Sequence, residues 1–246
     1  MAWGCGASDL DCPAGSYRGD FSSATSIFIN APTHLNLWEV EARDAYGNRI
    51  SPTSAIMSSM YDNDANSCGG CPINPAGSKC IDGVTNTVIG GRSESMCSTN
   101  IGDTDPWLRI DYPSGALSTL NEIVIYNRDK DCCNALINGA FVTITKGLPT
   151  TSASAKSSDF ALWTSAALTG TQSVYYLRVC LFCPSGTFSE AVGATSADVC
   201  LPCAEGKGSA EGSTIESACE NCKPGTFSEG GEDCLQCPAG QYSEEA

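Results

Sequence analysis

The last part of the chain begins with the stretch Cys180-Leu181-Phe182-Cys183-Pro184-Ser185-Gly186-Thr187-Phe188-Ser189. Its Cys-x2-Cys pair recurs as Cys200/Cys203, Cys219/Cys222 and Cys234/Cys237, at intervals of 20, 19 and 15 residues. Near-copies of the segment that follows the first pair stand at 224–228 and 238–243, and once far upstream, at 12–17. The sequence therefore predicts an array of small repeated modules in which a long middle segment is embedded.

The repeat region is rich in cysteine and poor in apolar side chains. Residues 180–246 hold eight of the sixteen cysteines, with two basic and eleven acidic residues. Leu, Ile, Val and Phe together supply nine of the 67 residues in this region, too little apolar area to offset the entropy of an ordered chain. We therefore expect cross-links to hold it together.

Two kinds of cross-link fit the spacing. The first two pairs, Cys180/Cys183 and Cys200/Cys203, lie at zinc-ribbon spacing, and four thiolates bind zinc tetrahedrally. The repetition, the acidic composition and the eight further cysteines outside this region favour disulfides instead. Disulfides in such number predict an extracellular or lumenal protein.

The overall charge excludes several classes of partner. The formal net charge is −15, which argues against binding to nucleic acid and against docking on an anionic membrane. No apolar run approaches the roughly 18 residues that a membrane span needs, so we expect no membrane insertion. The first residues have no charged and apolar signal pattern, so a secreted form would carry its signal outside this sequence.

The middle segment has the pattern of an all-β domain. Short runs rich in β-branched and aromatic residues lie between Gly, Pro, Asn and Ser clusters, at 26–30, 35–43, 107–112, 122–127, 140–146 and 173–179. Several alternate, as Ile123 with Ile125 and Val142 with Ile144, which predicts an antiparallel sandwich or barrel. No helical periodicity stands out, and we expect residues 148–171 to form a surface loop around one further strand.

The repeats resemble the ephrin-receptor-like cysteine-rich modules of extracellular proteins. In those modules the second cysteine of one pair joins the first cysteine of the next. The resemblance therefore implies the bonds Cys183–Cys200, Cys203–Cys219 and Cys222–Cys234. Each bond would close a loop of about 15 residues, a stabilisation of about 3 kcal/mol in the chain-entropy picture. The expected role of such a rod is that of a spacer.

Four stretches of the middle segment carry a second resemblance: 35–42 (LNLWEVEA), 80–83 (CIDG), 105–111 (DPWLRID) and 125–133 (IYNRDKDCC). From about residue 22 to 179 the chain resembles the fucolectin-type (F-type lectin) branch of the galactose-binding-like, coagulation-factor C-terminal family. This implies a jelly-roll β-sandwich with a sugar cleft and a structural calcium ion. The segments stand in a permuted order, which requires neighbouring termini and implies that Cys12 bonds Cys180.

We accordingly predict three parts: a cysteine-rich lead-in at 1–21, the lectin-like sandwich at 22–179 and the repeats at 180–246. The resemblance implies a calcium site in which Asp82 and Glu39 bind through carboxylates, with carbonyls near Trp38, Lys79, Val84 and Ser95. Calcium accepts such mixed oxygen ligands. The residues by themselves are equally compatible with a turn aspartate and a solvated strand glutamate.

The resemblance also implies a sugar site built from Arg128 and a Cys132–Cys133 bond between adjacent residues. The alternative is that Cys132 and Cys133 each bond a different neighbour. Two other positions depart from the family. Leu136 occupies the position of a second arginine, and Thr99 occupies the position of a histidine. A leucine cannot replace the paired donors of an arginine. The single histidine, His34, is interpreted as a surface side chain.

Catalysis finds no support in the motifs. Cys68-Gly-Gly-Cys71 has the spacing of a redox pair, but no strand–helix context follows it, and a structural bridge to Cys80 or Cys97 is favoured. No nucleophile elbow, zinc-hydrolase motif or phosphate loop occurs. We therefore expect no enzyme.

Two functions remain from the sequence: an extracellular structural and adhesive unit, and an active carbohydrate-binding lectin. The expected partners are glycans or extracellular glycoproteins, and neighbouring copies or further modules of the same polypeptide. Cys5 and Cys237 have no partner in the expected pairing, which predicts that they bond each other or join sequence outside 1–246.

Overall fold

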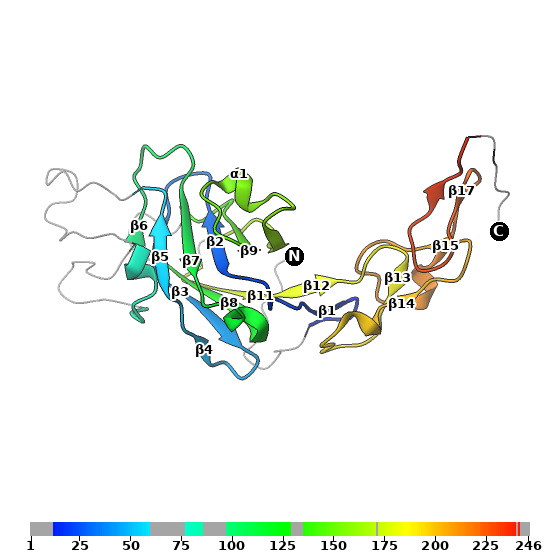
Figure 1. Cartoon of the computed structure of the whole chain (residues 1–246), viewed down its shortest axis with the longest axis horizontal. Helices are drawn as coiled ribbons and strands as arrows, with labels where there is room; N and C mark the ends of the chain where they lie inside the picture. The colour runs from blue at the N-terminus through cyan, green and yellow to red at the C-terminus, as the bar shows by residue number, and fades with distance from the viewer. Residues whose placement is uncertain are drawn as a thin grey trace, which may run out of the picture. The chain divides into compact units, whose positions relative to one another are not determined.

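The computed structural model describes residues 12–59, 77–85, 97–128, 135–170, 172–239 and 241. Strands dominate this part of the chain, and α1 (Ser152–Ala155) is its one α-helix. The chain divides into two compact units (Figure 1). The sheet unit is Phe21–Leu177, and the module unit combines Met1–Asp20 with Arg178–Ala246. The predicted all-β, disulfide-rich class is confirmed.

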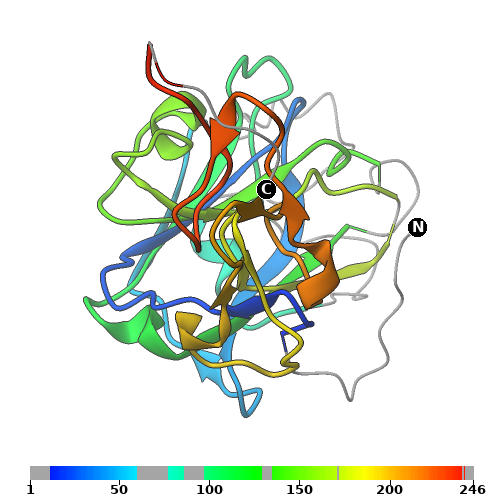
Figure 2. The ribbon, with the colours of Figure 1, turned by 90° about the vertical axis from the view of Figure 1, so that its right-hand side faces the viewer.

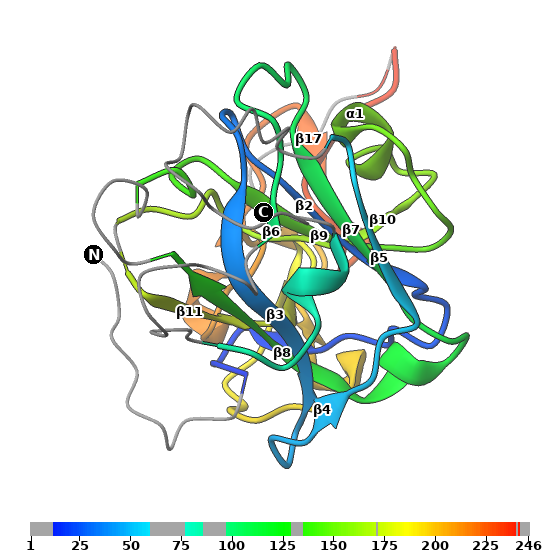
Figure 3. The ribbon, with the colours of Figure 1, turned by 90° about the vertical axis from the view of Figure 1, so that its left-hand side faces the viewer.

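The sheet unit contains two antiparallel sheets (Figure 3). One has the order β10-β9-β2-β7-β5, with bounds Ala161–Thr164, Phe141–Thr145, Ser26–Asn30, Trp107–Asp111 and Ser54–Met57. The other has the order β11-β8-β3-β4, with β6 also paired to β3. Its bounds are Val174–Arg178, Leu120–Asn127, Asn36–Asp44, Arg49–Ile50 and Cys97–Ser98.

The central strands of both sheets are buried along nearly their whole length. β2 and β8 contribute fully buried side chains such as Ile27, Ile29, Ile123 and Ile125. The sequence predicts alternation of Ile123 with Ile125 on one face, and the structure buries the other face of β8 as well, including Val124, Asn121 and Glu122. The six predicted runs correspond to β2, β3, β7, β8, β9 and β11.

The segment 148–171 contains the expected further strand, β10, and also a helix that the sequence did not predict. α1 is a single turn, too short to show helical periodicity. A capping box forms it, in which Thr151 and Ser154 satisfy each other's backbone N–H groups. Ala155 on this turn packs against Phe28 and Trp107 in a buried cluster.

The module unit repeats one small motif, a two-stranded antiparallel ribbon (Figure 2). A disulfide closes each ribbon. The first module is residues 12–18 with 180–183, and the second, third and fourth are 183–203, 203–222 and 222–237. Their ribbons are β1/β12 (Ser16–Arg18, Cys180–Phe182), β13/β14 (Thr187–Phe188, Leu201–Pro202), β15/β16 (Lys207–Gly208, Glu220–Asn221) and β17/β18 (Thr226–Phe227, Leu235–Gln236).

The first module is assembled from two segments far apart in sequence. Cys12 bonds Cys180 across 168 residues, whereas the disulfides of the other modules span 17, 16 and 12 residues. Arg18 lies opposite Cys180 in the β1/β12 ladder, so the chain leaves and re-enters this ribbon at paired positions. The sheet unit is therefore an insertion into one module. The expected lead-in at 1–21 is grouped with the repeats instead of forming a separate part.

An excision variant tests this insertion. Replacing residues 21–177 with a short Gly/Ser linker should leave Cys12 bonded to Cys180, because the ribbon of the first module is complete without them. Non-reducing peptide mapping of the refolded variant would show the bond. Mixed pairings of Cys12 would mean that the sheet unit is required to form this module.

Candidate functional site

Glu39 lies in the middle of β3, where the pairing with β8 shifts register between Leu37 and Glu39. Such an irregularity redirects side chains, and the Glu39 side chain is fully buried. Arg49, on the neighbouring strand β4, forms an ion pair with it at 2.5 Å between Nη2 and Oε1. The alternative of a solvated strand glutamate is therefore wrong for this residue.

A second carboxylate lies in the loop that follows the 3₁₀ turn Gly77–Cys80. Asp82 accepts a hydrogen bond from the backbone N–H of Val84 at 3.1 Å, the geometry of a turn aspartate, and its Oδ2 lies 3.6 Å from Lys79 Nζ. The guanidinium of Arg49 reaches the same loop, because Nη2 also donates to the carbonyl of Ile81 at 2.8 Å. Arg49 thus links β3 to the loop of Asp82.

The electrostatics of this cluster are dominated by the burial of Glu39. Burial raises the pKa of Glu39 from its ordinary value of 4.5 to about 8, although Arg49 and the backbone N–H of Gly83 oppose the rise. The charges of Asp82 and Glu41 raise the same pKa further, so Asp82 is within electrostatic range of Glu39. A buried carboxylate with such a raised pKa is stabilised by protonation or by a stronger positive charge beside it.

Two of the expected calcium ligands, Glu39 and Asp82, lie in this cluster. Glu39 Oε2 is buried and has no hydrogen-bond partner among the described residues, while Asp82 supplies a second hard oxygen nearby. These features fit a cation that prefers carboxylate and carbonyl ligands. Within the described ranges no group of three or more His, Cys, Asp or Glu side chains converges, and Ser95 lies outside them. Calcium would therefore depend on backbone carbonyls and compete with Arg49 for Glu39.

The residues expected to bind sugar are only partly described. Arg128 follows directly on β8 and is half-buried, whereas Cys132 and Cys133 lie outside the described residues. Leu136 is half-buried and accepts a hydrogen bond at its carbonyl from Thr33. Thr99 is fully buried, and its hydroxyl accepts the N–H of Leu35 at 2.8 Å. Thr99 therefore serves the fold and offers no group to a ligand.

His34 is the residue that the sequence interpretation missed. It is half-buried, and its pKa is lowered first by burial and then by the positive charge of Arg128. The structure thus brings the single histidine within electrostatic range of the candidate sugar-binding arginine. No local signal could have revealed this, because the two residues stand far apart in sequence.

The Cys80–Cys97 disulfide corrects one expectation. A bridge from the Cys68/Cys71 motif to Cys80 or Cys97 is wrong, because Cys80 and Cys97 bond each other. Both are fully buried, Cys80 at the end of its 3₁₀ turn and Cys97 at the start of β6, and β6 is paired to β3. Cys68 and Cys71 lie outside the described residues.

The cysteines of the modules form the pairs that the two resemblances imply. The structure has Cys12–Cys180, Cys183–Cys200, Cys203–Cys219 and Cys222–Cys234. The two members of each Cys-x2-Cys pair thus belong to successive modules. The zinc interpretation is wrong for these pairs, because bonded sulfurs cannot supply thiolates. Cys237 is the one free cysteine among the described residues.

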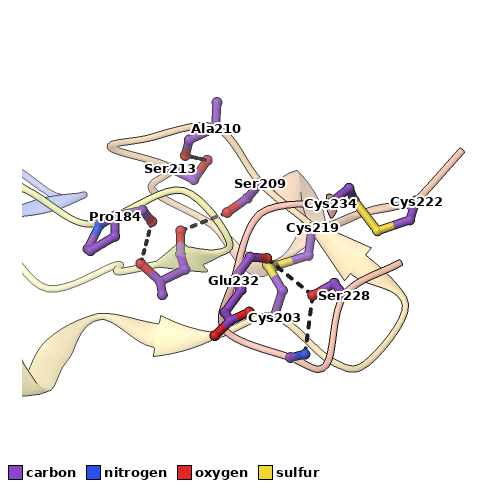
Figure 4. The surroundings of a disulfide bond; sticks show 12 residues. Pro184, Cys203, Ser209, Ala210, Ser213, Cys219, Cys222, Ser228, Glu232 and Cys234 are labelled. Carbon is purple, nitrogen blue, oxygen red and sulfur yellow. Dashed lines mark hydrogen bonds between the residues drawn. A yellow bond between two sulfur atoms is a disulfide. The ribbon is translucent and has the colours of Figure 1, made fainter. Parts of the chain in front are cut away.

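Successive modules are joined by the same backbone hydrogen bonds at three joints. A glycine N–H donates to the serine carbonyl of the next module, at Gly15–Ser189, Gly186–Ser209 and Gly206–Ser228. A loop glycine N–H of that next module donates back to a cysteine carbonyl, at Gly193–Cys12, Gly212–Cys183 and Gly231–Cys203. The modules therefore repeat in their contacts with one another as well as in their sequence. Figure 4 shows the surroundings of Cys203–Cys219 and Cys222–Cys234.

Comparison with protein-family models, curated proteins and solved structures finds no match to this chain. The five disulfides between described residues indicate that the protein folds in an oxidising, extracellular environment. Among the described residues, no helix is long and apolar enough to cross a membrane.

Proposed function

We propose that this chain is a non-enzymatic segment of an extracellular structural and adhesive protein at the cell surface or in a filament. In this proposal the sheet unit is a calcium-stabilised jelly-roll of the galactose-binding-like type, and the modules are its spacer. The observation that carries the proposal is that two backbone hydrogen bonds recur at three successive joints. A repeat whose units contact their neighbours in one recurring way builds an extended array, not a closed active site.

The composition of the modules supports the same role. Buried residues in the repeat region are mainly disulfide cysteines and hydroxyl side chains, such as Cys203, Cys222, Ser209 and Ser228. Covalent bonds thus replace a large apolar core, as in other small secreted domains. Such an array keeps its length without a ligand or a partner subunit.

Non-reducing peptide mapping of material from the natural source tests the structural role. We expect Cys237 to be bonded to a cysteine in another module or another copy, because its N–H already donates to the Gly225 carbonyl as Cys183, Cys203 and Cys222 do at earlier glycines. A free Cys237 thiol in native material, or a Cys5–Cys237 bond in a clean monomer, would contradict the role of a segment within a larger assembly.

A second candidate function, an active lectin, is favoured by the proximity of His34 and Arg128. An arginine and an imidazole can both donate to sugar hydroxyls. We expect Arg128→Ala to lower binding on a glycan array at least about tenfold, the loss of one charge-assisted hydrogen bond. His34→Ala removes a donor whose pKa is lowered, so we expect a smaller loss from this variant. Lys146→Ala is the control for removal of a surface charge. An array on which the unaltered chain binds no glycan, with or without calcium, would exclude this candidate.

A further inference from the structure

The joint between the third and fourth modules differs from the two joints before it. At the earlier joints a third backbone bond is present, from Arg18 N–H to the Ala194 carbonyl at 2.9 Å and from Ser189 N–H to the Ser213 carbonyl at 3.0 Å. Ser209 occupies the corresponding position in the third module, and its N–H makes no such bond within the described residues. The fourth disulfide closes a span of 12 residues instead of 16 or 17, so the fourth module is shorter than the two before it.

The position that holds an aromatic ring at the earlier joint holds a glycine at this one. In the second module Phe188 is buried against Cys203 and Cys219, so it fills the space between the second and third modules. The equivalent position in the third module is Gly208. An open surface hollow of about 620 Å³ lies beside it, between the third and fourth modules, and its lining includes both apolar and charged residues, among them Gly208, Ala218, Glu220, Lys223 and Asp233. The packing contacts that the Phe188 ring makes at the earlier joint are therefore missing here.

A side-chain bond is also redirected (Figure 4). Ser209 Oγ donates across the earlier joint to the Thr187 carbonyl at 2.8 Å and is buried. The hydroxyl of its counterpart, Ser228, donates instead to the backbone carbonyl of Glu232, inside the same module, at 3.2 Å. Among the described residues, the fourth module is held by two backbone bonds, of which Gly231–Cys203 is 3.2 Å long, and by close approaches of Glu232 to Gly186, of Cys234 to Gly208 and of Gly231 to Pro202.

We propose that the joint between the third and fourth modules is a hinge built into the array. The first three modules behave as one block, and the fourth opens away from it while every disulfide stays intact. Local opening begins where buried contacts and hydrogen bonds are fewest. In the spacer that we propose above, this hinge would let the array bend at one defined place; that use rests on the proposed function, whereas the hinge itself is a property of the isolated chain.

Native-state amide hydrogen exchange of the whole chain, read by NMR, tests the hinge. Two matched pairs of glycine amides make the same bonds at adjacent joints: Gly186 with Gly206, and Gly212 with Gly231. After correction for intrinsic rates, we expect Gly206 and Gly231 to exchange at least about tenfold faster than Gly186 and Gly212, since local opening free energies differ along a chain. Equal rates within each pair would overturn the hinge.

A substitution at the earlier joint should weaken that joint in the same way. Phe188→Gly removes the ring from the earlier joint and should raise the exchange rate of Gly212 toward that of Gly231. Phe227→Gly, an equal truncation in the fourth module, should leave the Gly212 rate unchanged. An unchanged Gly212 rate in Phe188→Gly would contradict the role of the ring. Should that variant fail to fold, the comparison of glycine pairs in the unaltered chain still decides.

Discussion

Replacing Gly186 with alanine is expected to detach the fourth module from the second and to disturb the stack between them. Gly186 has a φ of +82°, where an L-residue costs about 1–2 kcal/mol. A Cβ atom there would also lie 2.2 Å from the backbone of Glu232, which cannot yield as a flexible side chain could. The expected total exceeds about 3 kcal/mol, in the range of overpacking combined with backbone strain.

Gly225→Ala is the matched control. Gly225 has nearly the same φ, +85°, and a Cβ there would meet nothing within 4 Å. It should therefore show the backbone cost alone, about 1–2 kcal/mol. Urea titration followed by limited proteolysis of the fourth module measures both variants. If Gly186→Ala is no less stable than Gly225→Ala, the close packing of alternate modules through Gly186 is wrong.

Gly186 and Gly225 explain why a glycine recurs at this position of the modules. The glycine supplies a positive φ at Gly15, Gly186, Gly206 and Gly225, and at Gly15 and Gly186 the backbone of another module also approaches so closely that a side chain has no room. The sequence could predict a turn glycine from the local pattern. It could not predict the close approach, because this depends on how a module packs against the next module but one, as the second packs against the fourth.

The fold was predictable where local pattern and tertiary structure agree. The buried strands around Ile27 and Ile123 carry continuous apolar runs, and the module cysteines repeat at regular spacing. Prediction failed where a long-range contact decides the outcome. The strand β5 (Ser54–Met57) lies at a sheet edge with alternate residues exposed, and Cys80 and Cys97 meet only because β6 pairs with β3.

In the candidate site, too, some features follow from local sequence and others from long-range contacts. Arg128 and Asp82 can be selected from motifs, but the burial of Glu39 follows from its strand position and from Arg49 on the neighbouring strand. The proximity of His34 to Arg128 is likewise a product of the fold. The residues alone left a solvated glutamate open as an alternative, and the structure instead pairs the buried Glu39 with the partly exposed Arg49.

The largest effect expected in the sheet unit is that of Arg49→Met, which leaves Glu39 buried without its partner. Removing one member of a buried pair costs about 3–5 kcal/mol, and the lower end applies because Arg49 is partly exposed. The loss should be greatest above pH 8, where Glu39 is ionised, and smaller near pH 5, where its raised pKa keeps it protonated. Thermal unfolding at the two pH values measures this difference.

The unaltered sheet unit should itself become less stable as the pH rises from about 5 through 8. Glu39 ionises near pH 4.5 in the unfolded chain and near pH 8 in the folded one, so the folded state binds the extra proton between these values. Stability then falls with rising pH until the folded group has lost its proton. Glu39→Gln should remove this fall, whereas Glu41→Gln, the same change two residues along β3, should retain it.

Calcium should reverse the pH effect if Glu39 and Asp82 bind it. A bound cation stabilises the ionised carboxylate, and a ligand at 100 times its Kd adds about 2.7 kcal/mol to the folded state. At pH 8 we therefore expect millimolar calcium to raise the melting temperature of the chain by several degrees, and chelator to abolish the rise. Glu39→Gln and Asp82→Asn should both lose the response and Glu41→Gln should keep it. A melting curve that calcium and chelator leave unmoved would mean that Arg49 is the only cation that Glu39 binds.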